Sequence, residues 1–187
     1  MKAFVVEQYG KDGLRAADVR RPEVGDGDVL VKVSAASVNP LDKMVRDGEF
    51  KRLLKYRTPF VLGHDVAGVV TRVGSAVRGF QVGDEVYARP RDLRIGTFAE
   101  YIAIDEDDVA PKPDSLTLHE AAAVPLVALA AWQALVDRAP KTWPEGPHPR
   151  RLRRPGVDRH PARQAPRRDG GHDRERTERG AGAQPRR

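Results

Sequence analysis

The stretch from Thr58 to Ala88 constrains the fold of this chain more than any other part of the sequence. Its five glycines separate short runs rich in valine, such as Val66–Val73. Glycine permits tight turns and close approach of two backbones, and β-branched runs of this length favour strands. We therefore expect short strands joined by tight turns, with Gly83-Asp84 forming a hairpin between residues 80–82 and 85–87.

The rest of the first 139 residues follows the same pattern, with helix expected mainly near its end. Many short strands with little helix predict a mainly β (α+β) fold, a partly open β-barrel with short helices. The last helix is so apolar that we expect it to pack against something larger than this chain supplies. The expected strands are Lys2–Val6, Leu14–Val19, Val29–Ala36 and Gly96–Ile104, and the expected helices are Leu41–Asp47 closed by Gly48, Glu120–Val124 after a capping box at Thr117, and Leu126–Arg138.

The charge of the chain is divided unevenly. Residues 140–187 contain 13 Arg and one Lys against six Asp or Glu, a formal charge of +8, so the net charge of +6 leaves −2 for residues 1–139. The basic balance therefore gives no reason to expect nucleic-acid binding by the first part. The absence of Cys excludes disulfides and a thiol nucleophile. With no signal peptide and no apolar run of about 20 residues, we expect a cytoplasmic protein without membrane contact.

His64 and Asp65 interrupt a pattern that otherwise predicts core residues, between Val61-Leu62 and Val66-Ala67. Two ionisable side chains in such a place are candidates for functional chemistry. We therefore predict that both line a substrate cleft, and Tyr56 is a further candidate on its position alone.

Five motifs occur in one order and together point to a family. They resemble the amino-terminal, GroES-like domain of the medium-chain dehydrogenase/reductase superfamily, within its zinc-independent quinone oxidoreductase branch, and the resemblance covers residues 1–139. The motifs are S-V-N-P-L-D at 37–42, P-F-V-L-G-H-D-V-A-G-V-V at 59–70, V-G-D-E-V-Y at 82–87, G-T-F-A-E-Y at 96–101 and A-A-A-V-P-L-V-A-L-A-A-W-Q-A-L at 121–135.

The resemblance implies an oxidoreductase that uses NADPH to reduce a quinone, enone or aldehyde, in a family whose members are often homodimers. It implies a GroES-like domain at residues 1–124 and, at 125–139, a helix leading into a cofactor domain. It also implies that Asn39, Asp42 and Ala130 contact the cofactor. The residues themselves leave an alternative open, because Asn39 could simply build a turn and Asp42 could start a short helix, which we favour for Asp42.

Zinc is not expected. Zinc alcohol dehydrogenases of this superfamily have Cys where Asn39 stands, and His64 occupies the place of their ligand histidine. An amide is a poor zinc ligand and the chain has no Cys, so we predict no metal site. His64 is then interpreted as a histidine with its hydrogen bonds satisfied in the wall of the cleft.

Residues 140–187 lack the strand and glycine-rich turn with which a cofactor (Rossmann) domain would begin. They are rich in Arg and Pro and poor in aliphatic residues, so we predict a disordered tail and a missing dinucleotide site. The tail could bind nucleic-acid phosphates nonspecifically. The alternative that we favour is out-of-frame translation. When residues 157–173 are back-translated and the frame is moved by one base, they can give S-T-A-I-Q-L-A-K-R-L-G-A-T-V-A-T-T, which resembles the first cofactor-domain helix and the next strand of this family. Either way, the chain is expected to be impaired as an enzyme, and a fragment without enzymatic activity is a further alternative.

Overall fold

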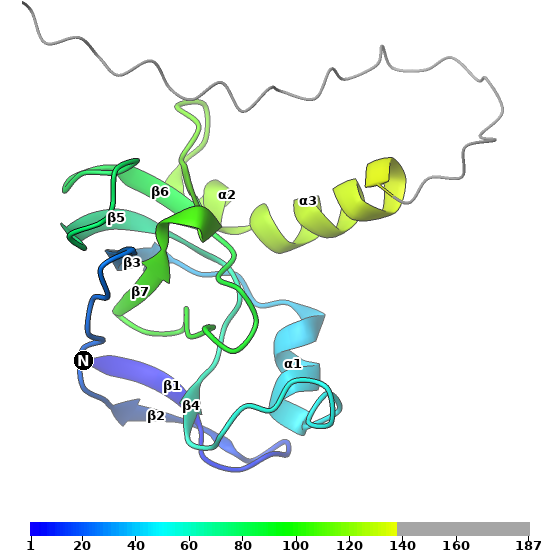
Figure 1. The fold of residues 1–187 in the computed structure, drawn as a ribbon. Coiled ribbons are helices and arrows are strands. Elements are labelled where there is room, and N and C mark those ends of the chain that lie inside the picture. Colours follow the sequence, from blue (N-terminus) through cyan, green and yellow to red (C-terminus); the bar gives the residue numbers. More distant parts are fainter. Residues whose placement is uncertain (138–187) are drawn as a thin grey trace, which may run out of the picture. The chain divides into compact units, whose positions relative to one another are not determined.

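The computed structural model describes residues 1–137. This part contains two antiparallel sheets and a few short helices (Figure 1). The mainly β architecture with short helices that the sequence predicts is confirmed for this part. The strands are β1 Lys2–Val6, β2 Leu14–Asp18, β3 Asp28–Ala35, β4 Phe60–Val61, β5 Val66–Val73, β6 Glu85–Ala88, β7 Tyr101–Asp105 and β8 Val109–Pro111, and the helices are α1 Pro40–Asp47, η1 Glu106–Asp108, α2 Leu118–Ala122, α3 Pro125–Trp132 and the π-helical η2 Gln133–Asp137.

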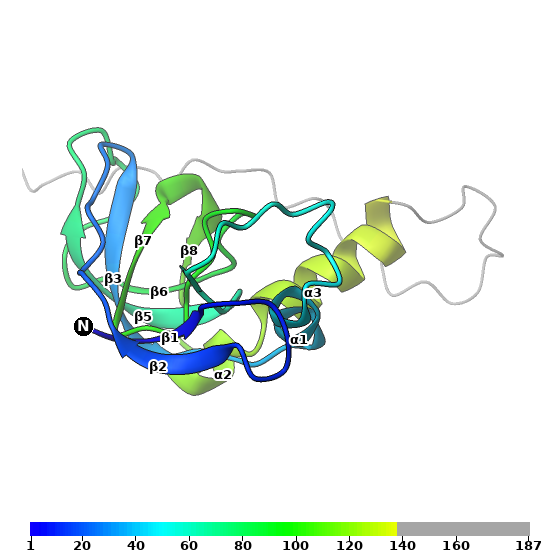
Figure 2. The same ribbon diagram turned by 90° about the horizontal axis from the view of Figure 1, so that it is seen from below.

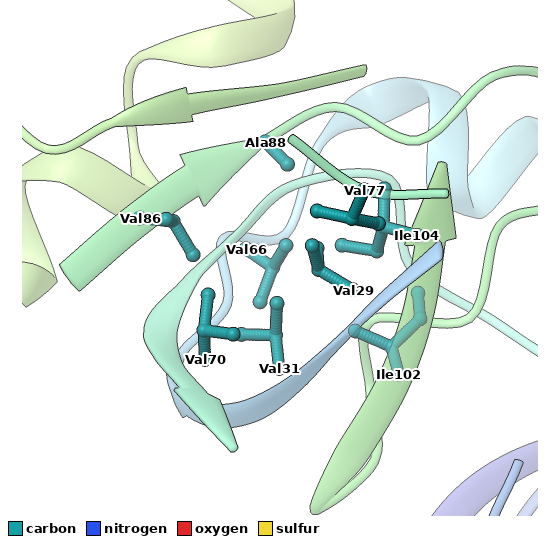
Figure 3. Close-up of a cluster of buried hydrophobic side chains, with 9 residues drawn as sticks. All are labelled: Val29, Val31, Val66, Val70, Val77, Val86, Ala88, Ile102 and Ile104. Atoms are coloured by element: carbon teal, nitrogen blue, oxygen red, sulfur yellow. The ribbon is translucent and has the colours of Figure 1, made fainter. Parts of the chain in front are cut away.

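The larger sheet curls around the main hydrophobic core. Its strand order is β7-β3-β5-β6-β8, and the smaller sheet has the order β2-β1-β4. Aliphatic side chains from β3, β5, β6 and β7 point towards one another inside the larger sheet (Figure 3). Within the described residues the edge strands β7 and β8 do not pair, so the barrel is partly open. The core residues are Val29, Val31, Val66, Val70, Val77, Val86, Ala88, Ile102 and Ile104.

The hairpin predicted at Gly83-Asp84 is wrong in its partner strand. Gly83 does have a positive φ of 98°, but the turn delivers β6 to β5. The N–H of Gly83 donates to the carbonyl of Val70 at 2.8 Å, and the N–H of Val70 donates to the carbonyl of Asp84 at 2.9 Å. The long strand β5 offers a ladder partner that residues 80–82 cannot match in length.

The strand predicted over 96–104 is shorter in the structure, since only Tyr101–Asp105 belongs to β7. The preceding residues lie between the two sheets. There the N–H of Phe4 donates to the carbonyl of Phe98 at 2.8 Å, and the N–H of Phe98 donates to the carbonyl of Leu62 at 2.9 Å. The segment thus leaves the larger sheet to pair with β1 and the chain after β4.

Both ends of α1 and the start of α2 follow the sequence signals. The expected helix over 120–124 instead ends at Ala122, and the expected helix over 126–138 is α-helical only to Trp132, after which the chain is π-helical. α1 begins at a proline and ends before Gly48, whose φ of 82° is the left-handed conformation expected after a helix. The capping box at Thr117 is formed, with the Glu120 carboxylate accepting from the Thr117 N–H at 2.8 Å. α1 and α3 lie on the same side of the sheets in both views (Figure 2). Large apolar side chains stay exposed on α3 and η2: Val127, Leu129, Trp132, Leu135 and Val136.

The predictions about residues 140–187, namely disorder, a basic tail and a missing cofactor domain, lie outside the described residues. The boundary placed after residue 124 also stays a prediction. Among the helices of the described part, none has the length and apolar character needed to cross a membrane.

Candidate functional site

Four polar side chains are buried where β3 leads into α1 and where β5 begins. Asn39, Asp42, His64 and Asp65 are 7%, 1%, 0% and 0% exposed. Asn39 has an extended backbone, as the residue before a proline must, and it stands at the N-terminus of α1. Gly63 has a φ of 111°, which glycine adopts readily, and it makes the turn before His64. A proline-started helix and a glycine turn thus bring these side chains together.

The Asp65 carboxylate is the centre of one group of hydrogen bonds. Its Oδ2 accepts from Asn39 Nδ2 and from Ser37 Oγ, both at 3.0 Å, and Asn39 Nδ2 also donates to Ser37 Oγ at 3.2 Å. Its Oδ1 accepts from the backbone N–H of Leu126 at 3.0 Å. Burial raises the pKa of Asp65, and the hydrogen bonds from these donors oppose the rise. Both amide hydrogens of Asn39 are thus used within the protein.

The Asp42 carboxylate is the centre of the other group. Its Oδ1 lies 2.6 Å from His64 Nδ1, and its Oδ2 accepts from the Asn39 N–H at 2.7 Å. The second contact is half of a capping box, the structural role that the sequence favoured for Asp42. Two buried polar atoms have no hydrogen-bond partner among the described residues, Nε2 of His64 and Oγ1 of Thr97.

The arrangement does not fit a metal ion. Within residues 1–137, no three His, Asp or Glu side chains form a group that could hold one. His64 offers one nitrogen, Nε2, because Nδ1 faces Asp42. Asn39 turns its NH₂ group towards acceptors, and an amide NH₂ is a donor without a lone pair for a metal. Zinc-independent chemistry remains a prediction.

The other two predicted site residues lie apart from this network. Tyr56 stacks on Phe60 with ring centroids 5.0 Å apart, and its hydroxyl accepts from the N–H of Leu93 at 3.3 Å. Burial raises the pKa of Tyr56. Ala130 is exposed on α3. The predicted roles of Tyr56 in a substrate cleft and of Ala130 at the cofactor stay predictions.

Two cavities lie beside the network rather than at its centre. The larger cavity has a volume of about 770 Å³ and a mostly apolar lining. Among the four buried polar residues of the network, only Asp42 lines it. The smaller, of about 510 Å³, lies between α3 and the strands β6 and β8. Asn39, His64 and Asp65 line neither cavity. The predicted cleft residues His64 and Asp65 are therefore fully enclosed, and any action on a ligand would pass through their neighbours.

Sequence reasoning missed three participants in or beside the network. Ser37 was detectable, because it lies two positions before Asn39 in an extended segment, where alternate side chains share a face. Thr97 and the backbone N–H of Leu126 carried no local signal.

Comparison with known proteins identifies the relatives of this domain. Residues 25–114 match the family described as the alcohol dehydrogenase GroES-like domain. The chain is 42% identical over 143 residues to the 2-methylene-furan-3-one reductase of Solanum lycopersicum, covering 72% of this chain and 37% of that protein. It is 41% identical over 144 residues to the chloroplastic NADPH-dependent alkenal/one oxidoreductase of Arabidopsis thaliana, covering 73% of this chain and 37% of the relative.

A solved structure shows the same likeness. The quinone oxidoreductase from Coxiella burnetii superposes with a TM-score of 0.68 at 34% identity, over 72% of this chain and 44% of that one. The chain thus spans about two fifths of the length of the relatives it matches. Together with the GroES-like fold, these matches place the chain in the medium-chain dehydrogenase/reductase superfamily, among its quinone oxidoreductase-like members.

Proposed function

We propose that this chain carries the catalytic-domain half of an NADPH-dependent, zinc-independent reductase of quinones, enones or aldehydes. The names of its relatives, a furanone reductase, an alkenal/one oxidoreductase and a quinone oxidoreductase, support this substrate class. The observation that carries the proposal is the buried network that joins Asn39 at the start of α1 to Leu126 at the start of α3. It links the two elements on which the cofactor contacts are predicted.

The described residues would act by binding and orientation. When bound, NADPH supplies the hydride, and the protein positions the reacting groups and excludes water. Asn39 provides an uncharged wall whose orientation is fixed by Ser37 and Asp65. The charged groups behind it are at most 1% exposed, so they are not available as acids or bases at the surface of the site. The described residues contain no glycine-rich cradle for the phosphates of a dinucleotide, so the proposal assigns them contacts with the nicotinamide end alone.

We further propose that the chain as it stands is impaired, lies in the cytoplasm and binds no zinc. For the parent protein we propose a homodimer, a frequent state in the family. The rival function is nonspecific nucleic-acid binding, favoured only by the charge of +8 on residues 140–187. A gel shift that weakens steeply with salt and disappears when those residues are removed would support the rival.

The deciding experiment compares this chain with the protein encoded when the reading frame is moved by one base after residue 139. The frame-shifted protein is expected to bind NADPH with micromolar affinity and to oxidise it when a quinone, an enone or an aldehyde is added. The chain as it stands is expected to do neither, and micromolar NADPH binding by it would overturn the proposed impairment.

A matched pair of variants tests the site in the frame-shifted protein. Asn39→Ala should lower turnover, whereas Val82→Ala, at a side chain that is 61% exposed and lines neither cavity, should not. If coding DNA holds no cofactor domain in another frame, or if the frame-shifted protein reduces none of the three substrates, the proposed function is wrong.

A further inference from the structure

The carboxylate of Asp65 is surrounded by three hydrogen-bond donors from two segments that lie far apart in the sequence. They are the hydroxyl of Ser37 after β3, the amide of Asn39 at the start of α1, and the N–H of Leu126 in the first turn of α3. Asp65 itself is 0% exposed, and no described Lys, Arg or His forms an ion pair with it. The negative charge is therefore held by oriented donors and by the positive end of a helix.

The first turn of α3 has few other partners for its N–H groups. Its N-cap residue, Val124, has no side chain that could accept a hydrogen bond, and Pro125 has no N–H to donate. The Leu126 N–H is thus a helix-terminal donor that is satisfied by a residue 61 positions earlier in the chain. Asp65 performs for α3 the task that a Ser or Asp at the N-cap performs for other helices.

The orientation of α3 depends on this first turn, because Pro125 is the one buried residue in the helix. The following turns expose large side chains such as Val127 and Leu129. A contact at the buried end therefore decides where the exposed part, with Ala130, points.

We propose that Asp65 is a positioning residue that locks α3 to the N-terminus of α1 and so fixes Ala130 relative to Asn39. Its place in a reduction rests on the proposed function, since Ala130 and Asn39 are the predicted cofactor contacts. The hydrogen-bond polarity is the specific feature: Asp65 accepts, Asn39 donates, and Ser37 does both.

This polarity allows a rescue by exchange. In Asp65→Asn, the new NH₂ group at position 65 faces the NH₂ group of Asn39, so two donors meet. The amide oxygen at position 65 can still accept from the N–H of Leu126. In the double variant Asn39→Asp/Asp65→Asn, donor and acceptor change places: Asn at 65 donates to Asp at 39, and the hydroxyl of Ser37 can reverse its role. Asp is also a good N-cap residue, so α1 keeps its start.

Amide hydrogen exchange of Leu126, followed by NMR on the full chain, tests the proposal. Asp65→Ala removes the acceptor and should raise the exchange rate of Leu126 by about tenfold or more. Asp65→Asn should give an intermediate loss, and the exchange double variant should recover the protection of the wild type. Asp84→Asn, which changes a carboxylate that accepts from the Gln81 N–H in a distant turn, serves as the control and should leave Leu126 unchanged.

Equal protection in the wild type and Asp65→Ala would overturn the proposal. The proposal would also be overturned if the double variant is folded, as shown by an unchanged far-UV spectrum, and its Leu126 amide still exchanges as fast as in Asp65→Asn. Neither measurement depends on NADPH, so failure of the proposed reductase function and failure of this inference are distinguishable.

Discussion

Replacing Asp42 by Ala removes a carboxylate that two buried donors require. His64 Nδ1 lies 2.6 Å from Oδ1, and the N–H of Asn39 donates to Oδ2 at 2.7 Å. The three residues are 1%, 0% and 7% exposed, so water cannot replace the lost acceptor without opening the structure. Ala is a good residue inside a helix, so the change does not itself disfavour α1.

The expected loss follows from the two donors left without a partner. An unsatisfied buried donor costs about 1–3 kcal/mol, so two of them imply a loss of about 2–6 kcal/mol in the free energy of unfolding. Asp92→Ala is the control. This change removes the ion pair between Asp92 and Arg89, whose N···O distance of 2.8 Å is similar to the distances around Asp42. The side chain of Asp92, however, is 44% exposed. Surface pairs of this kind contribute about 0–1 kcal/mol.

Urea unfolding followed by circular dichroism measures both losses. A variant with His64→Leu added to Asp42→Ala completes a double-mutant cycle, because it removes one of the stranded donors. The double variant should therefore lose about 1–3 kcal/mol less than the sum of the two single variants. If Asp42→Ala loses no more than Asp92→Ala, or if the two changes add without coupling, the buried pair does not stabilise the fold as argued.

Three further results are expected. Gly63→Ala should lose about 3 kcal/mol in urea unfolding, because an added Cβ would lie 2.3 Å from Thr97 Oγ1 at a φ of 111°, whereas Gly27→Ala meets nothing within 4 Å and should be nearly neutral. Burial raises the pKa of Asp65, so the folded state holds this proton more tightly than the unfolded chain does. The contribution of Asp65 to the free energy of unfolding should then decline as pH rises from about 4 through the raised pKa. Over this pH range the wild type should lose stability relative to Asp65→Asn, which has no carboxyl group at this position to titrate. If the free energies of unfolding of the two proteins change in parallel with pH, this expectation is wrong. Tyr56→Phe should change stability by less than about 1 kcal/mol, because the ring stack remains and only one hydrogen bond of 3.3 Å is lost; a larger loss would show that the hydroxyl has another partner.

Local signals predicted the elements whose ends are decided within a few residues. A proline at the first position and Gly48 after the last one bound α1, and a run rich in valine gave the limits of β5. The hairpin at Gly83-Asp84 was assigned to the wrong strands because turn residues specify that the chain reverses and not which strand receives it. Pairing is decided by the whole sheet, through contacts between residues far apart in sequence.

His64 and Asp65 were evident from the sequence as polar residues among apolar neighbours, and Asn39 was found through the family resemblance. The absence of Cys spoke against zinc. The tertiary structure alone decided what these groups do. It uses both amide hydrogens of Asn39 inside the protein and joins Asp65 to Leu126 across 61 positions. The physical reason is that the cost of burying a polar group depends on which donor or acceptor lies within about 3 Å, and only the folded chain brings such partners together.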